Sequence, residues 1–194
     1  KLNLNTGSGK HRNLLGALSH DLRSQPTPNA HPHPAHANLI AWAGSDWQLV
    51  ALDGLHPHHG QLTDPNFWLS QCQARLAGLG IGRVRKNGVA AIQELVHFSP
   101  EIFRGGLLTG PVDYRLAHRM AQDVVDFAAR HFGTRRLLLA IVHLDEQTPH
   151  LTHYILPLSL RATKPAGRPR KGTTAARRPA VRKLHLAAHR LFNS

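Results

Sequence analysis

The sequence predicts an α/β domain of the α+β kind, in which helices flank an antiparallel sheet. Residues 87–99, 135–144 and 151–158 carry apolar strand patterns, and residues 113–132 carry a helical pattern. Only the short segment DEQTPH lies between the last two strands, so we expect them to be neighbours that pair as a hairpin. These observations together predict the fold class.

The first half of the chain is expected to begin with a short amphipathic helix. Its leucines recur at helical spacing over residues 10–23. Pro26 and Pro28 disfavour helix in the residues before them, so this helix should end there. Residues 38–52 are then expected to be extended, with a turn at Gly44–Ser45.

Two longer helices are expected further along. Asp64 and Pro65 are a typical N-cap and first helical residue, and the helix after them should end at the glycines of AGLGIG. A stripe of residues three or four apart predicts the helix from Asp113 to about Phe132, and Gly133 should end it. No internal repeat is visible.

Charge is the strongest global signal. The 194 residues hold 24 Lys and Arg against 11 Asp and Glu, a formal net charge of +13. Such an excess favours a polyanionic partner, most often nucleic acid. The hydrophobic content of 41% indicates a folded core, and the single Cys72 excludes an intrachain disulfide, which suits a reducing cytoplasm. No apolar run is long enough to span a membrane, so no membrane insertion is expected.

A change in composition divides the chain. Residues 161–194 hold ten basic residues and no acidic one. We expect a folded domain over residues 1–160 and a basic, flexible arm or linker over 161–194. Such an arm can neutralise phosphates without reading sequence, and it can equally be a solvated linker to further sequence. The first residue is Lys, and whether the chain is a fragment stays open.

The segment HLDEQTPH, residues 143–150, concentrates groups that bind metals and protons. If the flanking strands pair, His143 and His150 face each other closely enough to hold one cation. Asp145 and Glu146 lie in the turn, where either could bind the cation or hold a histidine ring. On these residues alone, a structural hairpin tip and a metal-assisted phosphodiester site both remain open.

Alternation along the second strand assigns its side chains to two faces. His150, Thr152 and Tyr154 should share one face, and His153 should lie on the other. His153 is therefore not expected to bind the same ion as His150.

Three segments, in order, resemble the motifs of the Mob/Pre plasmid mobilisation and recombination enzymes, the MOBV class of relaxases. HLDEQTPHLTHYILPL resembles their third motif, H-x-D-E-x-T-P-H followed by a short strand. LSHDLRSQPTPNAHP resembles the first motif, and GVAAIQELVHFSPEIF, with its internal Glu, resembles the second. The similarity covers about residues 10–158.

The resemblance implies an enzyme, a metal-dependent DNA relaxase with the His-hydrophobe-His fold. Such an enzyme nicks one strand of plasmid DNA at a transfer origin, keeps the 5′ phosphate covalently attached and later rejoins the strand. It implies a divalent cation, Mn or Mg, and plasmid DNA, single-stranded or supercoiled, as the partner. It further implies a bacterial cytoplasmic protein, and it leaves open a homodimer formed through further C-terminal sequence.

The motifs carry roles onto single residues of this chain. His20 matches the nucleophile, and Glu146 is our candidate for the carboxylate that holds its other ring nitrogen. His143 and His150 match metal ligands, with Asp145 as a candidate to complete the set. Arg23 matches the motif arginine and is expected to contact a phosphate or the carboxylates of the site. Asn29 matches the asparagine of TPNA and is expected to position the DNA.

The sequence offers further candidates for the nucleophile and for DNA contacts. Tyr154 is the alternative nucleophile, because most relaxases of other classes use tyrosine and because it shares the face of His150. Arg83, Arg85 and Lys86 form a basic turn that could contact the DNA backbone, although a solvated turn explains them equally well.

Two departures from the family pattern leave a rival open. Thr152 stands where many members have a third histidine ligand, and Asp21 stands beside the nucleophile where Asn is commoner. Asp21 could raise the basicity of His20 or lie in solvent. Loss of a ligand favours the rival, a catalytically degenerate DNA-binding domain of the same fold. A metal-dependent hydrolase unrelated to plasmid transfer is a third hypothesis.

Overall fold

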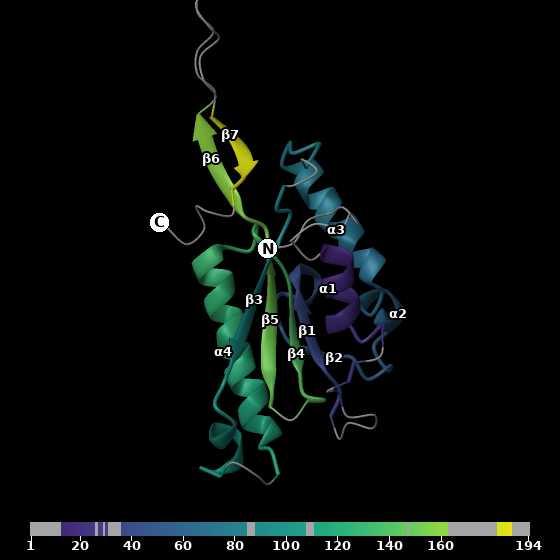
Figure 1. Cartoon of the computed structure of the whole chain (residues 1–194), viewed down its shortest axis with the longest axis vertical. Helices are drawn as coiled ribbons and strands as arrows, with labels where there is room; N and C mark the ends of the chain where they lie inside the picture. The colour runs from purple at the N-terminus through teal and green to yellow at the C-terminus, as the bar shows by residue number, and fades with distance from the viewer. Residues whose placement is uncertain are drawn as a thin grey trace, which may run out of the picture.

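A five-stranded antiparallel sheet forms the centre of the molecule (Figure 1). The computed structural model describes residues 13–25, 27–28, 30, 36–84, 88–107, 111–146, 148–162 and 182–187. The strand order is β2-β1-β4-β5-β3, and every neighbouring pair is antiparallel. The strands are β1 (Leu39–Trp42), β2 (Val50–Ala51), β3 (Ile92–His97), β4 (Leu137–His143) and β5 (His150–Ile155). The predicted fold class is confirmed.

Helices pack on both faces of the sheet and divide the core in two. Helices α1 (Leu14–Asp21) and α3 (Pro65–Gly78), with the short α2 (His59–Leu62), cover one face, and α4 (Tyr114–Phe132) covers the other (Figure 1). The alternation of β4 explains the division, because Leu139 and Ile141 belong to the first core while Ala140 and Val142 belong to the second.

The predicted helix ends are present where capping residues were recognised. Asp64 accepts the N–H of Asn66 at the start of α3, and Asp113 accepts the N–H of Leu116 at the start of α4. Helix α1 begins one residue after its cap, Asn13, and is shorter than the pattern over residues 10–23 suggested. Residues 10–12 lie outside the described residues.

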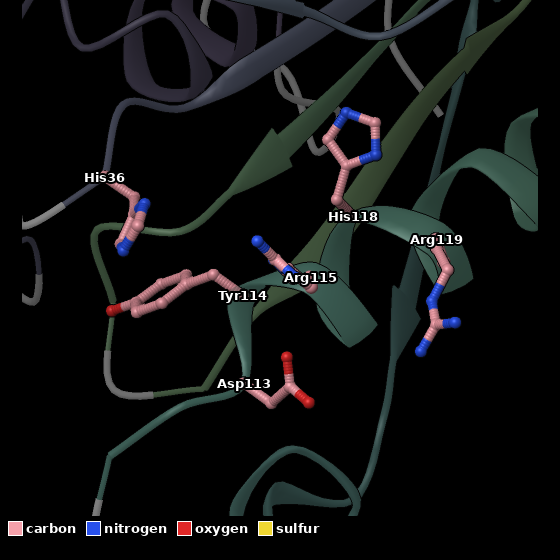
Figure 2. Close-up of a pocket in the computed structure, with 6 residues that line it drawn as sticks. All are labelled: His36, Asp113, Tyr114, Arg115, His118 and Arg119. Atoms are coloured by element: carbon pink, nitrogen blue, oxygen red, sulfur yellow. The ribbon is translucent and has the colours of Figure 1, made fainter.

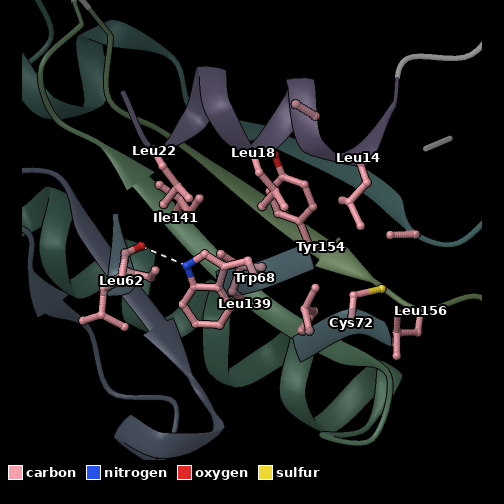
Figure 3. Packing of buried hydrophobic residues seen from close by; sticks show 14 of the residues in the cluster. Leu14, Leu18, Leu22, Leu62, Trp68, Cys72, Leu139, Ile141, Tyr154 and Leu156 are labelled. Atoms are coloured by element: carbon pink, nitrogen blue, oxygen red, sulfur yellow. Dashed lines mark hydrogen bonds between the residues drawn. The ribbon is translucent and has the colours of Figure 1, made fainter. Parts of the chain in front are cut away.

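The core under α1 holds the helix bearing His20 against the sheet. Figure 3 shows Leu14 and Leu18 of α1, and Leu22 directly after it, packed over Ile141 and Tyr154. Trp68 of α3 is buried beside them, and its indole N–H donates to the carbonyl of Leu62 at 2.8 Å. This apolar contact fixes the position of α1 relative to β4 and β5.

A separate two-stranded sheet follows. Strand β6 (Leu158–Ala162) pairs with β7 (Arg182–Leu186) and extends past one end of the main sheet (Figure 1). The expected domain boundary at residue 160 falls inside β6, so the start of the expected arm is part of a strand pair. Among the described residues, no helix has the length and apolar content needed to cross a membrane.

The reactivity of the Cys72 thiol can be used to test the packing of α3. Its side chain is fully buried, and burial raises the pKa of the thiol to about 12. At pH 8 roughly one molecule in 10⁴ then carries the reactive thiolate. We expect a thiol reagent to label the native protein far more slowly than the protein denatured in guanidinium. Equal rates would show that α3 does not pack as described.

Candidate active site

Two histidines face each other at one end of the sheet. His143 ends β4, His150 begins β5, and the two residues are partners in the strand register. Their rings are stacked, with centroids 4.6 Å apart and an interplanar angle of 28°. The cross-strand pairing expected from the sequence is therefore present.

His143 is buried and lacks hydrogen-bond partners. Its side chain is 1% exposed, and neither ring nitrogen has a partner in the part of the chain that is described. Burial is the main reason why the pKa of His143 is lowered to about 3, so the ring is neutral at neutral pH. An unpartnered buried polar group costs roughly 1–3 kcal/mol, and a neutral imidazole has a lone pair for a metal ion. His143 thus fits a metal ligand.

Glu146 completes a group of three potential ligands. One ligand atom from each of His143, Glu146 and His150 lies within 4.8 Å of the others. Two imidazoles and a carboxylate suit a divalent transition metal such as Mn²⁺. The residues present therefore fit the cation that the sequence led us to expect.

Asp145, the further candidate for the metal-ligand set, is bonded to Arg23. Its two carboxylate oxygens accept from Arg23, at 2.7 Å from Nε and 2.8 Å from Nη2. Arg23 Nη2 also donates to Glu146 at 2.6 Å. Arg23 was predicted to contact either a phosphate or the carboxylates of the site, and the structure contains its contact with the carboxylates.

The ion pair changes the titration of both partners. Burial alone would lower the pKa of Arg23, but its bonds with Asp145 and Glu146 outweigh burial and raise that pKa. Burial alone would raise the pKa of Asp145, yet the bonds from Arg23 and Asn38 lower it. Both groups therefore stay charged at neutral pH, and the pair connects the turn after α1 to the β4–β5 turn.

Asn38 shapes this turn and was not identified from the sequence. Its side-chain oxygen accepts the backbone N–H groups of Leu144 at 2.8 Å and Asp145 at 3.2 Å. Asn38 precedes β1 and lies 106 residues from Leu144, so no local pattern indicated the contact.

His20 lies near the end of α1 with an exposed ring. Its side chain is 58% exposed, and its Nδ1 lies 3.0 Å from Oδ1 of Asp21, which is 4% exposed. Glu146, the carboxylate predicted for this place, bonds to Arg23 instead. The carboxylate that contacts His20 is therefore Asp21, and not Glu146 as predicted. Because Asp21 is buried, the alternative that its side chain lies in solvent is excluded.

Asp21 is held by two further donors. Its Oδ2 accepts the hydroxyl of Tyr154 at 2.8 Å and the amide of Gln93 at 3.0 Å. Tyr154 is fully buried, and burial, followed by the charge of Asp21, raises its pKa well above 10. A buried phenol that donates to a carboxylate does not reach DNA, which argues against Tyr154 as the nucleophile.

Alternation assigns the remaining strand residues as predicted. Thr152 is buried on the face of His150, between Ile141 and Leu95 in the strand register. His153 lies on the other face, where its Nδ1 is 3.0 Å from the carboxylate of Glu94. Glu94, the internal Glu of the second motif, is thus a partner of His153.

The predicted DNA contacts are only partly described. Arg83 is exposed in the segment between α3 and β3. Asn29, Arg85 and Lys86 lie outside the described residues.

A cavity of about 660 Å³ lies at the start of α4 (Figure 2). The rings of Tyr114 and His36 are 3.6 Å apart at one side of it, and the exposed Arg115 and Arg119 lie along the helix. The whole lining is His36, Asp113, Tyr114, Arg115, His118 and Arg119. It contains none of the three potential metal ligands.

Comparisons with known proteins show what the chain is similar to. Residues 78–167 match the sequence profile of Mob_Pre, described as plasmid recombination enzyme. This stretch therefore has the sequence profile of the Mob/Pre family. It contains His143, Glu146 and His150, whereas His20 and Arg23 precede it. No curated protein sequence matches the chain.

Solved structures extend the Mob/Pre likeness to most of the chain. The MobM relaxase domain (MOBV; Mob_Pre), bound to plasmid pMV158 oriT DNA and Mn at pH 5.5, has 19% identity and a TM-score of 0.52 over 75% of this chain. A MobM complex at pH 6.8 has 18% identity and a TM-score of 0.51 over 76% of it. These likenesses establish the fold. The chain spans 65% of the length of the MobM chains it matches.

Proposed function

We propose that this chain is a metal-dependent DNA relaxase domain that nicks one strand of plasmid DNA and retains the 5′ phosphate on His20. The observation that carries the proposal is the arrangement around His20. Its exposed ring is bonded through one nitrogen to the buried Asp21, and Arg23, on the turn after the same helix, bonds to Asp145 and Glu146 in the β4–β5 turn. The fold shared with the DNA-bound MobM domain supports it.

His20 can act as a nucleophile because Asp21 fixes its tautomer. With its proton on Nδ1, the ring donates to Asp21 and leaves the Nε2 lone pair free. Nε2 attacks the scissile phosphorus and forms a P–N bond, while the P–O3′ bond breaks. The 3′ oxygen leaves with the electron pair and takes a proton from water. The positive charge on the ring faces the carboxylate of Asp21.

His143, Glu146 and His150 would hold the divalent cation, with Mn, the ion in the MobM structures, or Mg as the candidates. When bound, the ion would polarise the phosphate and offset the charge that develops on it. Arg23 holds Glu146 within the group and balances the charge of Asp145. We infer that Arg23 is a positioning residue for the ligand turn.

DNA contacts extend beyond the reacting phosphate. We infer that Asn29, Arg83, Arg85 and Lys86 contact the DNA, and that Arg115 and Arg119 beside the cavity contact its backbone. Plasmid DNA, single-stranded or supercoiled at its transfer origin, is the proposed partner, and the net charge of +13 supports it.

The arginines beside the cavity can be tested through salt dependence. We expect Arg115→Ala with Arg119→Ala to lower the slope of log affinity against log salt for single-stranded DNA by about 1.4, because two phosphate contacts are lost. Arg130→Ala, an exposed residue near the other end of α4, is the matched control. Binding is measured by fluorescence anisotropy. An unchanged slope in the double variant would show that Arg115 and Arg119 do not contact the DNA backbone.

The same proposal covers the extent of the domain, its cellular location and its biological role. We propose a relaxase domain over residues 1–160 followed by a basic arm that assists DNA binding, in a bacterial cytoplasmic protein that acts in plasmid mobilisation or recombination. A homodimer through further C-terminal sequence is compatible with this arrangement.

A plasmid nicking assay tests the function. The purified chain is incubated with Mn and a supercoiled plasmid that carries its cognate transfer origin, and the products are denatured and resolved. We expect a nicked strand with attached protein, and no such product when a chelator removes the metal. Salt-sensitive DNA binding without any nicked product would favour the catalytically degenerate DNA-binding domain, for which Thr152 was the sequence signal.

A further inference from the structure

A third histidine continues the row formed by His143 and His150. His97, the last residue of β3, is the register partner of His150 on its other side. The rings of His97 and His150 are 5.3 Å apart at 33°, close to the spacing and tilt between His150 and His143. Partners in an antiparallel register point to the same face, so three strands contribute one histidine each to one line.

Exposure increases along this line. His143 is buried, His150 is partly buried, and His97 is exposed on β3, which is an edge strand. The potential ligand group occupies the buried end, because it contains His143 and His150 but not His97. The exposed end is the side from which a DNA strand can approach.

The ring of His97 is available for a substrate. The ring stacks on that of His150, and within the described residues no hydrogen bond occupies either of its nitrogens. His153, by comparison, is bonded to Glu94 on the opposite face. A free imidazole in a chain of net charge +13 suits an anionic ligand such as a phosphate.

Thr152 does not occupy this place, although it shares the face of the three histidines. It lies deeper along β5 and is buried opposite Leu95 and Ile141. The third histidine of this site thus lies across the sheet on β3 instead of two residues along β5.

We propose that His97 is a catalytic residue whose ring N–H donates to a non-bridging oxygen of the scissile phosphate. The proposal rests on the proposed function, because it assumes that the group of His143, Glu146 and His150 holds the ion at that phosphate. His97 then stabilises negative charge on the phosphate from the solvent side. It does not bind the metal.

The test compares two substitutions at His97. His97→Ala removes the donor, whereas His97→Asn keeps an N–H donor. The matched control is His131→Ala, an exposed histidine in the last turn of α4, outside the site. Single-turnover nicking rates are measured with Mn, and Mn affinity is measured without DNA by electron paramagnetic resonance of the free ion.

We expect His97→Ala to slow nicking by about 10²-fold, as for loss of one charge-stabilising donor, with an unchanged Mn affinity. His97→Asn should recover part of the rate, and His131→Ala should match the unmodified chain. An unchanged rate in His97→Ala would overturn the proposal, and so would a fall in Mn affinity, which would make His97 a metal ligand. If the unmodified chain binds Mn but does not nick, the proposed function itself fails, and the proposal for His97 fails with it.

Discussion

Replacing His20 with alanine is expected to abolish nicking and the covalent adduct. Loss of a nucleophile lowers the rate by roughly 10³-fold or more. The side chain is 58% exposed and outside the apolar core, so the variant should keep its thermal stability and its metal affinity. The measurements are single-turnover nicking with Mn, thermal unfolding and Mn binding.

Tyr154→Phe is the comparison for this variant. It removes the hydroxyl that donates to Asp21 but leaves His20 and its bond in place. We expect it to retain nicking and to lower the free energy of unfolding by about 1–3 kcal/mol, because a buried carboxylate loses a donor. Loss of the adduct in Tyr154→Phe, with its retention in His20→Ala, would exchange the roles of the two residues.

The second large effect is expected for Asp21→Asn. All three groups bonded to Asp21 act as donors, so an amide would turn an N–H₂ group toward one of them. If the amide faces His20, the ring loses the tautomer that leaves Nε2 free to attack. We expect the nicking rate to fall by about 10²–10⁴-fold, as in a serine protease triad that loses its orienting aspartate.

Gln93→Ala is the control for Asp21→Asn, because it distinguishes an effect on the nicking reaction from an effect on folding. It removes one donor to Asp21 and leaves the bond between Asp21 and His20 intact. Its nicking rate should stay within about threefold of the unmodified chain. If Asp21→Asn had an equally small effect, Asp21 would not orient the nucleophile.

The sheet and the metal end of the site were predictable from local patterns. Alternation and the short connection between β4 and β5 are sufficient to place His143 opposite His150 and to turn His153 away. Glu146 was recognised as a site residue, although its predicted role at His20 was wrong. These features depend on neighbours in sequence, so periodicity reveals them.

The surroundings of His20 depend on contacts between distant parts of the chain. Tyr154 and Asp21 are 133 residues apart, and Asp145 and Arg23 are 122 apart. Which carboxylate contacts which cation there follows from how α1 packs on the sheet, which local patterns do not encode. Asp21 was noticed as a departure from the family pattern, but its burial could not be inferred.

Strand β7 shows a different limit of prediction from the sequence. Its residues alternate between exposed and partly buried, with Lys183 and His185 exposed and Leu184 and Leu186 packed against the core under α1. This period of two was visible in RKLHL, but the excess of basic residues over 161–194 dominated the prediction. The composition of a segment therefore did not decide its local structure.

Identification of the residue that carries the DNA tests the central claim most directly. Trypsin cleavage after Arg12 and Arg23 releases residues 13–23, in which His20 is the sole histidine, whereas Tyr154 falls in residues 137–161. The adduct formed with Mn is digested with trypsin and nuclease at neutral pH and analysed by mass spectrometry. We predict a nucleotide on the peptide of residues 13–23 through an acid-labile P–N bond. A nucleotide on the peptide of residues 137–161, through an acid-stable bond to Tyr154, would contradict the account.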